Sequence, residues 1–215
     1  MRCYLVEQLD DDSITQSISD QPEEQLPEGD LLVQVDWSSL NYKDALAATG
    51  HPGVVRNFPH VPGIDAAGTV LQSSDPDLPT GSQVVVTGRE MGSGRWGGWS
   101  ERIRVPADWA VLLPASLSAR ESMELGTAGF TAAQCIEALE LNNVVPASGP
   151  IAVTGASGGV GSLAIRMLSG LGYEVIAVSR KAEMSSQLQA WGAAECWTPE
   201  ELVDKPDRPL LKADL

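Results

Sequence analysis

Residues 151–165 read Ile151-Ala-Val-Thr-Gly-Ala-Ser-Gly-Gly-Val-Gly-Ser-Leu-Ala-Ile165. A short apolar run leads into a cluster of four glycines, and helical spacing of apolar residues follows it. This order predicts a strand, a tight turn and the N-terminus of a helix. Backbone N–H groups at such a terminus carry partial positive charge, and glycines let a pyrophosphate approach the backbone. The stretch therefore predicts a site for a dinucleotide.

The sequence after the glycines supports this interpretation. Gly170 and Gly172 are typical helix C-terminal residues, and 174–178 is a second apolar, strand-like run. Together these segments form one βαβ unit of about 30 residues. The glycine spacing is G-x-x-G-x-x-G rather than the commoner G-x-G-x-x-G, so a glycine-rich turn that binds nothing is the alternative. Apolar residues recur at helical spacing between the two strands: Val160, Leu163, Ala164, Met167, Leu168 and Leu171.

The end of the second strand indicates which dinucleotide binds. A site for NAD usually carries an acidic residue there, about 20 residues after the glycines, for the ribose 2′-hydroxyl. This chain has Ser179-Arg180-Lys181 instead, and its first carboxylate, Glu183, comes later. Two cations and a hydroxyl suit a 2′-phosphate, so we predict NADP as the cofactor. The alternative is a solvated pair of surface cations.

Composition limits the partners. The chain has 215 residues, 43% of them hydrophobic, and a net charge of −15. That charge argues against nucleic acid or an anionic membrane as a partner, because both require a basic surface. The scattered cysteines Cys3, Cys135 and Cys196 form no disulfide pattern. With no membrane-length apolar run and no signal peptide at the N-terminus, the expected location is the cytoplasm.

Residues 1–120 show a different pattern. Short β-rich runs punctuated by Gly and Pro predict a partly open β-barrel. Ser118-Ala-Arg-Glu121 is a capping-box signature that starts a helical stretch, which we expect to be divided at Gly129 and to reach about Asn143. The predicted fold class is therefore α/β: a barrel domain, 1–120, followed in 121–215 by a bridging helix and the N-terminal half of a parallel, doubly wound nucleotide-binding domain. The predicted barrel strands are 3–6, 31–37, 68–71, 83–86 and 101–105.

Several blocks in this order resemble the zinc-free medium-chain dehydrogenase/reductase family, in its branch of acrylyl-CoA reductases and quinone oxidoreductases. The resemblance covers essentially the whole chain and implies a GroES-like barrel followed by a Rossmann domain. It implies reduction of the conjugated C=C bond of a small enoyl thioester, or of a quinone, by hydride from NADPH. The blocks are Trp37–Ala45, Phe58–Val70, Trp96–Gly98, Gly126–Ala132 and Val153–Gly161.

The resemblance also implies roles for individual residues. Tyr42 and Asn41 would be catalytic, and Tyr42 and Thr127 would lie beside the nicotinamide. The alternative for Tyr42 is a half-buried loop tyrosine with a structural hydrogen bond. The family more often has Gly and Arg at the positions of Arg180 and Lys181; the change from Arg to Lys keeps the charge but loses the planar fork. The implied pyrophosphate contacts are Ser157, Gly158, Gly159 and Val160, and the implied 2′-phosphate contacts are Ser179, Arg180 and Lys181.

A metal is not expected. Pro62-Gly-Ile-Asp65 stands where zinc-dependent relatives have a His-Glu pair, and a catalytic zinc needs three protein ligands. We interpret His51 and His60, the only histidines, as loop residues beside prolines. The resemblance also implies that the full-length protein forms a homodimer, as members of the family commonly do.

From Ile151 onward the chain has 65 residues, about half of what a six-stranded doubly wound sheet needs at about 30 residues per βαβ step. Only one further short strand, near 195–197, is expected after the first two. We therefore expect an N-terminal portion of a longer fold. Two functions remain open: an NADPH-dependent reductase, or an inactive, truncated nucleotide-binding or interaction remnant of such an enzyme.

Overall fold

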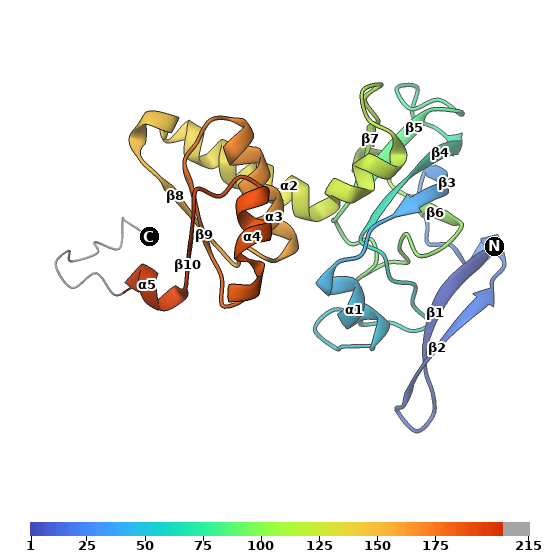
Figure 1. Ribbon diagram of the computed structural model, residues 1–215. Helices are drawn as coiled ribbons and strands as arrows, with labels where there is room; N and C mark the ends of the chain where they lie inside the picture. Colours follow the sequence, from blue (N-terminus) through green and yellow to red (C-terminus); the bar gives the residue numbers. More distant parts are fainter. Residues whose placement is uncertain (204–215) are drawn as a thin grey trace. The chain divides into compact units, whose positions relative to one another are not determined.

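The computed structural model describes residues 1–203 and divides into two compact units, the first being Met1–Thr127 and the second beginning at Ala128. Residues 204–215, the end of the second predicted domain, lie outside the described part. No helix within the described residues is long and apolar enough to span a bilayer. Elements of the first unit are β1 (Arg2–Gln8), β2 (Ile14–Asp20), β3 (Leu31–Ser38), α1 (Tyr42–Ala48), β4 (Asp65–Ser73), β5 (Gln83–Thr87), β6 (Arg102–Val105) and β7 (Ala110–Leu112) (Figure 1).

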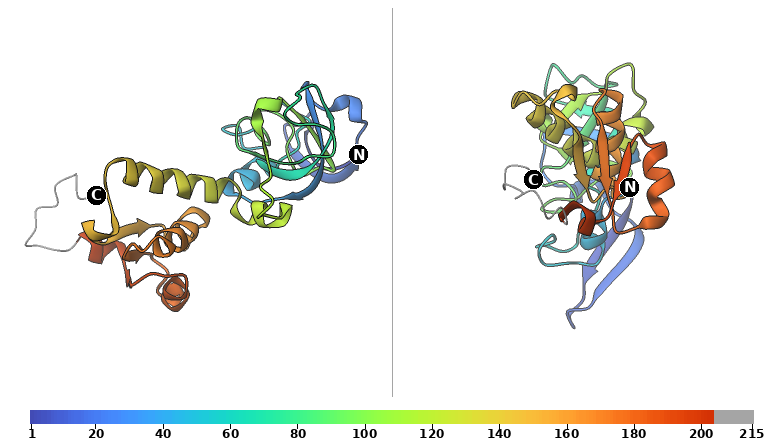
Figure 2. Two further views of the ribbon diagram at one scale, coloured as in Figure 1. Left: turned by 90° about the horizontal axis from the view of Figure 1, so that it is seen from above. Right: turned by 60° about the vertical axis from the view of Figure 1, so that its left-hand side comes forward.

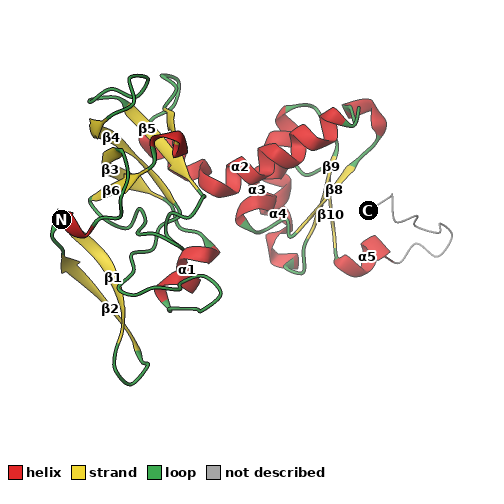
Figure 3. Cartoon of the chain, turned by 180° about the vertical axis from the view of Figure 1, so that it is seen from behind, coloured by secondary structure: helices red, strands yellow, loops and turns green. Residues whose placement is uncertain are grey.

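The first unit is built on a five-stranded antiparallel sheet. Its strand order is β6-β3-β4-β5-β7, and β1 and β2 form a separate hairpin, visible from behind in Figure 3. The sheet does not close on itself, in agreement with the predicted partly open barrel. Alternating apolar residues of the strands make its core, where Leu31, Val33, Val70, Val84, Val86, Ile103 and Val105 are each at most 1% exposed.

β3 and β4 approach each other unusually closely at Gly68. A Cβ atom there would lie 1.9 Å from the carbonyl oxygen of Gln34, so no other residue fits without moving the strand. The pairing register of the two strands also shifts between Val35 and Trp37. This irregularity lies near the end of β3, shortly before the segment that leads into α1.

All five predicted barrel strands are present, but two strands and one α-helix of this unit were not predicted: β2, β7 and α1. β2 is largely exposed and polar, and β7 has three residues, so neither carries a strong apolar pattern. α1 has seven residues and begins after Asn41, whose backbone N–H donates to the Asp44 carboxylate at 2.8 Å. Such an N-terminal cap offsets the weak propensity of so short a helix.

The bridging helix α2 (Ala119–Leu141) begins at the predicted capping box. The Ser118 N–H donates to the Glu121 carboxylate at 2.9 Å, and the Glu121 N–H donates to the Ser118 hydroxyl at 3.2 Å. The predicted division at Gly129 is wrong: the helix is broken at Gly126, with φ 50° and ψ −154°. A Cβ atom at Gly126 would lie 2.7 Å from a carboxylate oxygen of Asp65, so tertiary packing places the break there.

The second unit contains the predicted βαβ arrangement. Its parallel sheet has the order β10-β9-β8, and within the described residues β8 pairs with β9 alone. Helices α3 and α4 pack against the strands (Figure 2). Its core includes Ile165, Leu168, Val175, Ala177 and Leu188, all at most 2% exposed. The elements are β8 (Ile151–Thr154), α3 (Gly159–Gly170), β9 (Val175–Val178), α4 (Ser185–Ala190), β10 (Glu195–Trp197) and α5 (Pro199–Val203).

Candidate functional site

The glycine-rich turn connects β8 to α3 as the sequence predicts. Gly155 adopts φ +60°, and the Gly158 N–H returns to the Gly155 carbonyl at 2.8 Å, which closes the turn. A Cβ atom at Gly161 would lie 2.5 Å from that same carbonyl, so the helix can start this close to the strand only with glycine. The N–H groups in the first turn of α3 have no acceptor within the helix and are available to an anion.

A pocket of about 480 Å³ joins this turn to the end of β9. Arg180 and Lys181 line it and are exposed, and no ion pair with a carboxylate involves either residue in the described part of the chain. The Ser179 hydroxyl accepts the Lys181 backbone N–H at 3.1 Å, a local bond just after the end of β9. The full lining is Thr154, Gly155, Ser157, Val178, Ser179, Arg180, Lys181, Pro199 and Leu202.

Sequence reasoning missed Pro199 and Leu202, which give this pocket an apolar wall from α5. A signal was available, because α5 follows β10, and the carboxyl ends of parallel strands share one edge of a sheet. The other predicted pyrophosphate contacts, Gly158, Gly159 and Val160, line a neighbouring apolar groove of about 530 Å³ between α2, β8 and α3. The pocket and the groove meet at Thr154 and Gly155, which line both.

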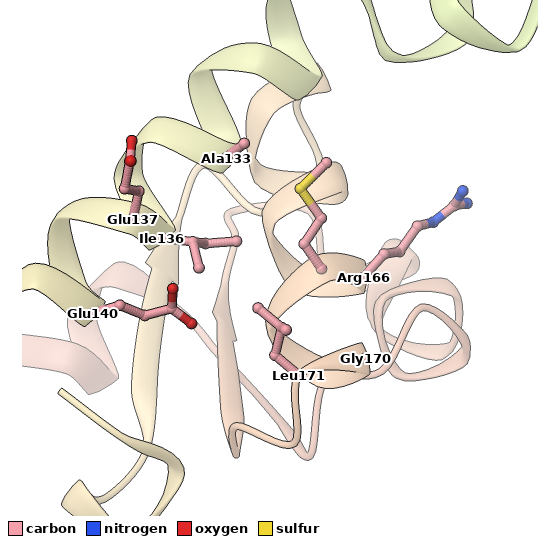
Figure 4. Close-up of a pocket in the computed structure, with 8 residues that line it drawn as sticks. Ala133, Ile136, Glu137, Glu140, Arg166, Gly170 and Leu171 are labelled. Carbon is pink, nitrogen blue, oxygen red and sulfur yellow. The ribbon is translucent and has the colours of Figure 1, made fainter. Parts of the chain in front are cut away.

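A third hollow in the same unit contains none of the predicted site residues. It measures about 400 Å³ and lies between α2 and α3, where Ile136 and Leu171 give it an apolar floor (Figure 4). Glu137, Glu140 and Arg166 surround this floor. The mixture of charges does not favour an anion, so we assign no part of the nucleotide site to it.

The first unit holds a separate cluster of buried polar groups. Asp44 and Asp65 are both fully buried. One Asp44 oxygen accepts the backbone N–H groups of Gly63 and Ile64, at 3.1 and 2.8 Å. Burial raises the pKa of Asp44, the negative charge of Asp65 adds to the rise, and hydrogen bonds from Asn41 and Ile64 oppose it. The carboxylate of Asp44 thereby fixes the turn that leads into β4.

The predicted residues Asn41 and Thr127 meet on the second buried carboxylate. The Asn41 side-chain amide donates to Asp65 at 2.8 Å and to the Ser39 hydroxyl at 2.8 Å. The Thr127 hydroxyl donates to Asp65 at 2.6 Å. Tyr42 occupies the first position of α1 and is 81% exposed, so it is not the half-buried tyrosine of the alternative interpretation. The catalytic roles of Asn41 and Tyr42 stay predictions.

His60, interpreted from the sequence as a loop residue beside a proline, is buried. It is 2% exposed, and its Nε2 lies 3.0 Å from the Gly92 carbonyl, which fixes the ring between two loops. Burial lowers the pKa of His60, and the hydrogen bond to Gly92 partly opposes this. Among the described residues no group of three or more His, Cys, Asp or Glu side chains could hold a metal ion.

Comparison with known proteins identifies both parts of the chain. Residues 27–115 match the family model of the alcohol dehydrogenase GroES-like domain. AcuI of Escherichia coli K12, named a probable acrylyl-CoA reductase, is 49% identical over 212 residues, which cover 99% of this chain and 64% of AcuI. YhfP of Bacillus subtilis, named as a candidate quinone oxidoreductase, is 44% identical over 189 residues, which cover 88% of this chain and 57% of YhfP.

Solved structures agree with these matches. YhdH of Escherichia coli K-12 with bound NADPH gives a TM-score of 0.89 at 48% identity, covering 98% of this chain and 64% of that one. YhfP of Bacillus subtilis with NAD bound gives a TM-score of 0.90 at 41% identity, covering 94% of this chain and 61% of that one. The chain therefore spans less than two thirds of the length of these relatives.

Proposed function

Because the chain belongs to the medium-chain dehydrogenase/reductase family, in the branch of acrylyl-CoA reductases and quinone oxidoreductases, we propose that it forms part of an NADPH-dependent reductase. The reaction is transfer of hydride to the conjugated C=C bond of a small enoyl thioester of the acrylyl-CoA type, or to a quinone. One observation supports the choice of cofactor: the pocket beside the glycine turn is lined by Arg180 and Lys181, and within residues 1–203 neither forms an ion pair with a carboxylate. Structures of relatives have been solved with NADPH and with NAD, so the choice between NADP and NAD is argued from this chain's own residues.

The pyrophosphate, the 2′-phosphate and the adenosine end of the cofactor each have a counterpart in the second unit. The pyrophosphate would bind at the turn of Ser157, Gly158, Gly159 and Val160, where the first N–H groups of α3 are open. Arg180, Lys181 and the Ser179 hydroxyl would hold the 2′-phosphate by charge-assisted hydrogen bonds. Pro199 and Leu202 would cover the apolar face of the adenosine end.

The bound cofactor would supply the hydride, and the protein would stabilise the negative charge that develops on the substrate and supply a proton. Addition of hydride to the β-carbon of an enoyl thioester creates an enolate, which needs a proton at the α-carbon and a hydrogen-bond donor at its oxygen. We assign the proton to the exposed phenol of Tyr42, either as direct donor or through water. Asn41 and Thr127, whose side chains donate hydrogen bonds to Asp65, would face the ligand beside Tyr42.

Further properties belong to the same proposal. The full-length protein would work in the cytoplasm as a homodimer, without nucleic acid, membrane or metal. Net charge of −15 supports the absence of polyanionic partners. Light scattering coupled to size-exclusion chromatography tests the dimer.

The decisive experiment measures NADPH oxidation by the purified protein with acrylyl-CoA and, separately, with a benzoquinone. Turnover of acrylyl-CoA with reduction of its C=C bond, followed by mass spectrometry of the product, supports the thioester reaction; turnover of the quinone alone supports the other substrate. Binding of NADPH without turnover of either would support the alternative of an inactive remnant, which the similarity to named reductases does not favour.

A further inference from the structure

The loop 89–95, which follows β5 and Gly88, is folded on itself. The Glu90 carbonyl accepts three backbone N–H groups from later residues of the loop, at 2.9 to 3.2 Å, and the Gly92 N–H donates to the Arg95 carbonyl at 2.9 Å. Gly88 adopts φ 66°, so the chain turns sharply where the loop begins. Its own hydrogen bonds hold the loop in shape, and it can therefore move as one body.

Three side chains attach this loop to the rest of the first unit. Met91 is 0% exposed and belongs to the core of the five-stranded sheet. The Arg95 guanidinium lies 5.5 Å from the centroid of the Trp109 ring. The His60 Nε2 lies 3.0 Å from the Gly92 carbonyl oxygen. In the described part of the chain, no other hydrogen bond connects the loop to residues outside it.

His60 is held in place independently of the loop. Its backbone N–H donates to the Val6 carbonyl and its carbonyl accepts the Val6 N–H, both at 2.8 Å, so β1 fixes this residue. The side chain is 2% exposed. The loop packs directly on the segment after His60, since a Cβ atom at Gly92 would lie 2.5 Å from the carbonyl carbon of Gly63. Opening of the loop would therefore bring the His60 ring into contact with water.

A protonated His60 would be a buried cation without a partner. Proton uptake gives the ring a second N–H donor and a positive charge, and an unpaired buried charge costs free energy. Among residues 1–203 no carboxylate forms an ion pair with His60. Burial lowers the pKa of His60, and the hydrogen bond to Gly92 partly opposes this. The closed loop therefore disfavours the charged form of the ring.

The titratable groups on the surrounding elements do not neutralise such a cation. Glu7 of β1 and Glu90 of the loop are exposed to solvent. The buried carboxylate of Asp44 already accepts two backbone N–H groups of the segment after His60. The other titratable side chains of β1 and of the loop are Arg2, Cys3, Tyr4, Arg89 and Arg95.

We propose that His60 holds the loop 89–95 closed at neutral pH and releases it at acidic pH. The neutral ring donates to the Gly92 carbonyl, and Met91 stays in the core. Below about pH 6.5, proton uptake favours an open form in which the ring is hydrated and Met91 leaves the core, while the sheet stays folded. Since opening binds one proton, its equilibrium constant rises by up to about tenfold per pH unit. This release requires no bound cofactor, so it does not depend on the proposed function.

Oxidation of methionine by hydrogen peroxide tests the proposal, because a buried thioether reacts when the structure opens to water. Met91 is the probe, and Met123 of α2, which is 6% exposed, is the internal control in the same unit. The purified protein is treated at about pH 7.5 and about pH 5.5, and the sulfoxide in each peptide is measured by mass spectrometry. The oxidation rate of Met91 should rise about tenfold at the lower pH, and that of Met123 should stay within about twofold.

Two histidine variants assign the effect to the ring of His60. His60→Gln removes the titrating group but keeps an amide that can donate to the Gly92 carbonyl, so the rate at Met91 should become independent of pH. His51→Gln is the matched control. His51 is exposed, and its Nδ1 accepts the Gly53 N–H at 3.1 Å. This variant should keep the rise of the wild-type protein.

Each outcome supports or overturns the proposal. Equal rates at Met91 in wild-type protein at the two pH values overturn it. A parallel rise at Met91 and Met123 also overturns it, because the whole unit then unfolds. A rise that persists in folded His60→Gln assigns the effect to another group. If His60→Gln does not fold, loss of the rise in His51→Gln overturns the proposal, and its persistence together with a constant rate at Met123 supports it.

Discussion

The preference for NADPH over NADH can be reversed by changing Lys181. Arg180 and Lys181 line the pocket at the end of β9, and both are exposed. Within residues 1–203, neither of them forms an ion pair with a carboxylate. A 2′-phosphate placed there gains two cationic partners, whereas the 2′-hydroxyl of NADH gains at most a neutral hydrogen bond. We expect wild-type protein to bind NADPH at least about tenfold more tightly than NADH, a difference of about 1.4 kcal/mol.

The size of the change follows from the exposure of the two cations. A unit charge pair at about 4 Å is worth about 1 kcal/mol in water and about 4 kcal/mol at the dielectric of a protein surface. Lys181→Asp removes one attraction to the phosphate and adds a repulsion, so we expect NADPH to bind about 100-fold more weakly, a loss of about 2.7 kcal/mol. NADH should bind somewhat more tightly, because the new carboxylate can accept its 2′-hydroxyl.

Dissociation constants for both cofactors, measured by fluorescence titration or calorimetry at two salt concentrations, check this prediction. Salt should weaken NADPH binding more than NADH binding, because exposed charges are screened over about 10 Å at 0.1 M. Arg166→Ala is the matched control: this cation lies in the same unit but stacks on Trp191 at 4.8 Å and does not line the pocket. Equal affinities of wild-type protein for NADPH and NADH, or an unaltered preference in Lys181→Asp, would refute the reasoning.

Four further predictions concern catalysis, metal, pH and folding. Tyr42→Phe should lower kcat about 100-fold, within the usual range for a proton donor, and leave the NADPH dissociation constant unchanged; normal kcat would remove Tyr42 from the mechanism. A chelator should not alter NADPH oxidation, and stoichiometric zinc lost together with activity would contradict the metal-free proposal. Burial holds the pKa of His60 below its ordinary 6.5. The contribution of neutral His60 to stability is therefore complete above pH 6.5 and is lost as the pH falls through the lowered pKa. His60→Gln should make the denaturant midpoint decline less steeply below pH 6.5, and a decline as steep as that of the wild-type protein would contradict this prediction. Gly126→Ala should lower the free energy of unfolding by about 2 kcal/mol, because of strain at positive φ and the contact of the new Cβ with Asp65. Gly170→Ala is the control and should not lower it, because a Cβ atom there meets nothing within 4 Å. Equal thermal midpoints for the two variants would show that the close approach at Gly126 does not require glycine.

The nucleotide-binding half was predictable because its determinants are local. The glycines, the apolar run before them and the helical spacing after them lie within one continuous segment, and β8, α3 and β9 form as predicted. Arg180 and Lys181, which follow β9, line the pocket because the carboxyl ends of parallel strands lie at the same edge of the sheet. The capping box at Ser118 and Glu121 is equally local, and it forms.

The buried cluster of the first unit depended on tertiary structure. Asp65 and Thr127 lie 62 positions apart, and nothing in the sequence between them indicates that they share hydrogen bonds. The same distance explains the misplaced break in α2: Gly126 and Gly129 are equally plausible from the sequence, and only the approach of Asp65 selects Gly126. Sequence pattern determines which segments become strands and helices, because burial and turn preferences act on neighbouring residues. Which buried carboxylate receives which donors is decided when distant segments pack, because a buried charge is stable only where enough donors converge on it.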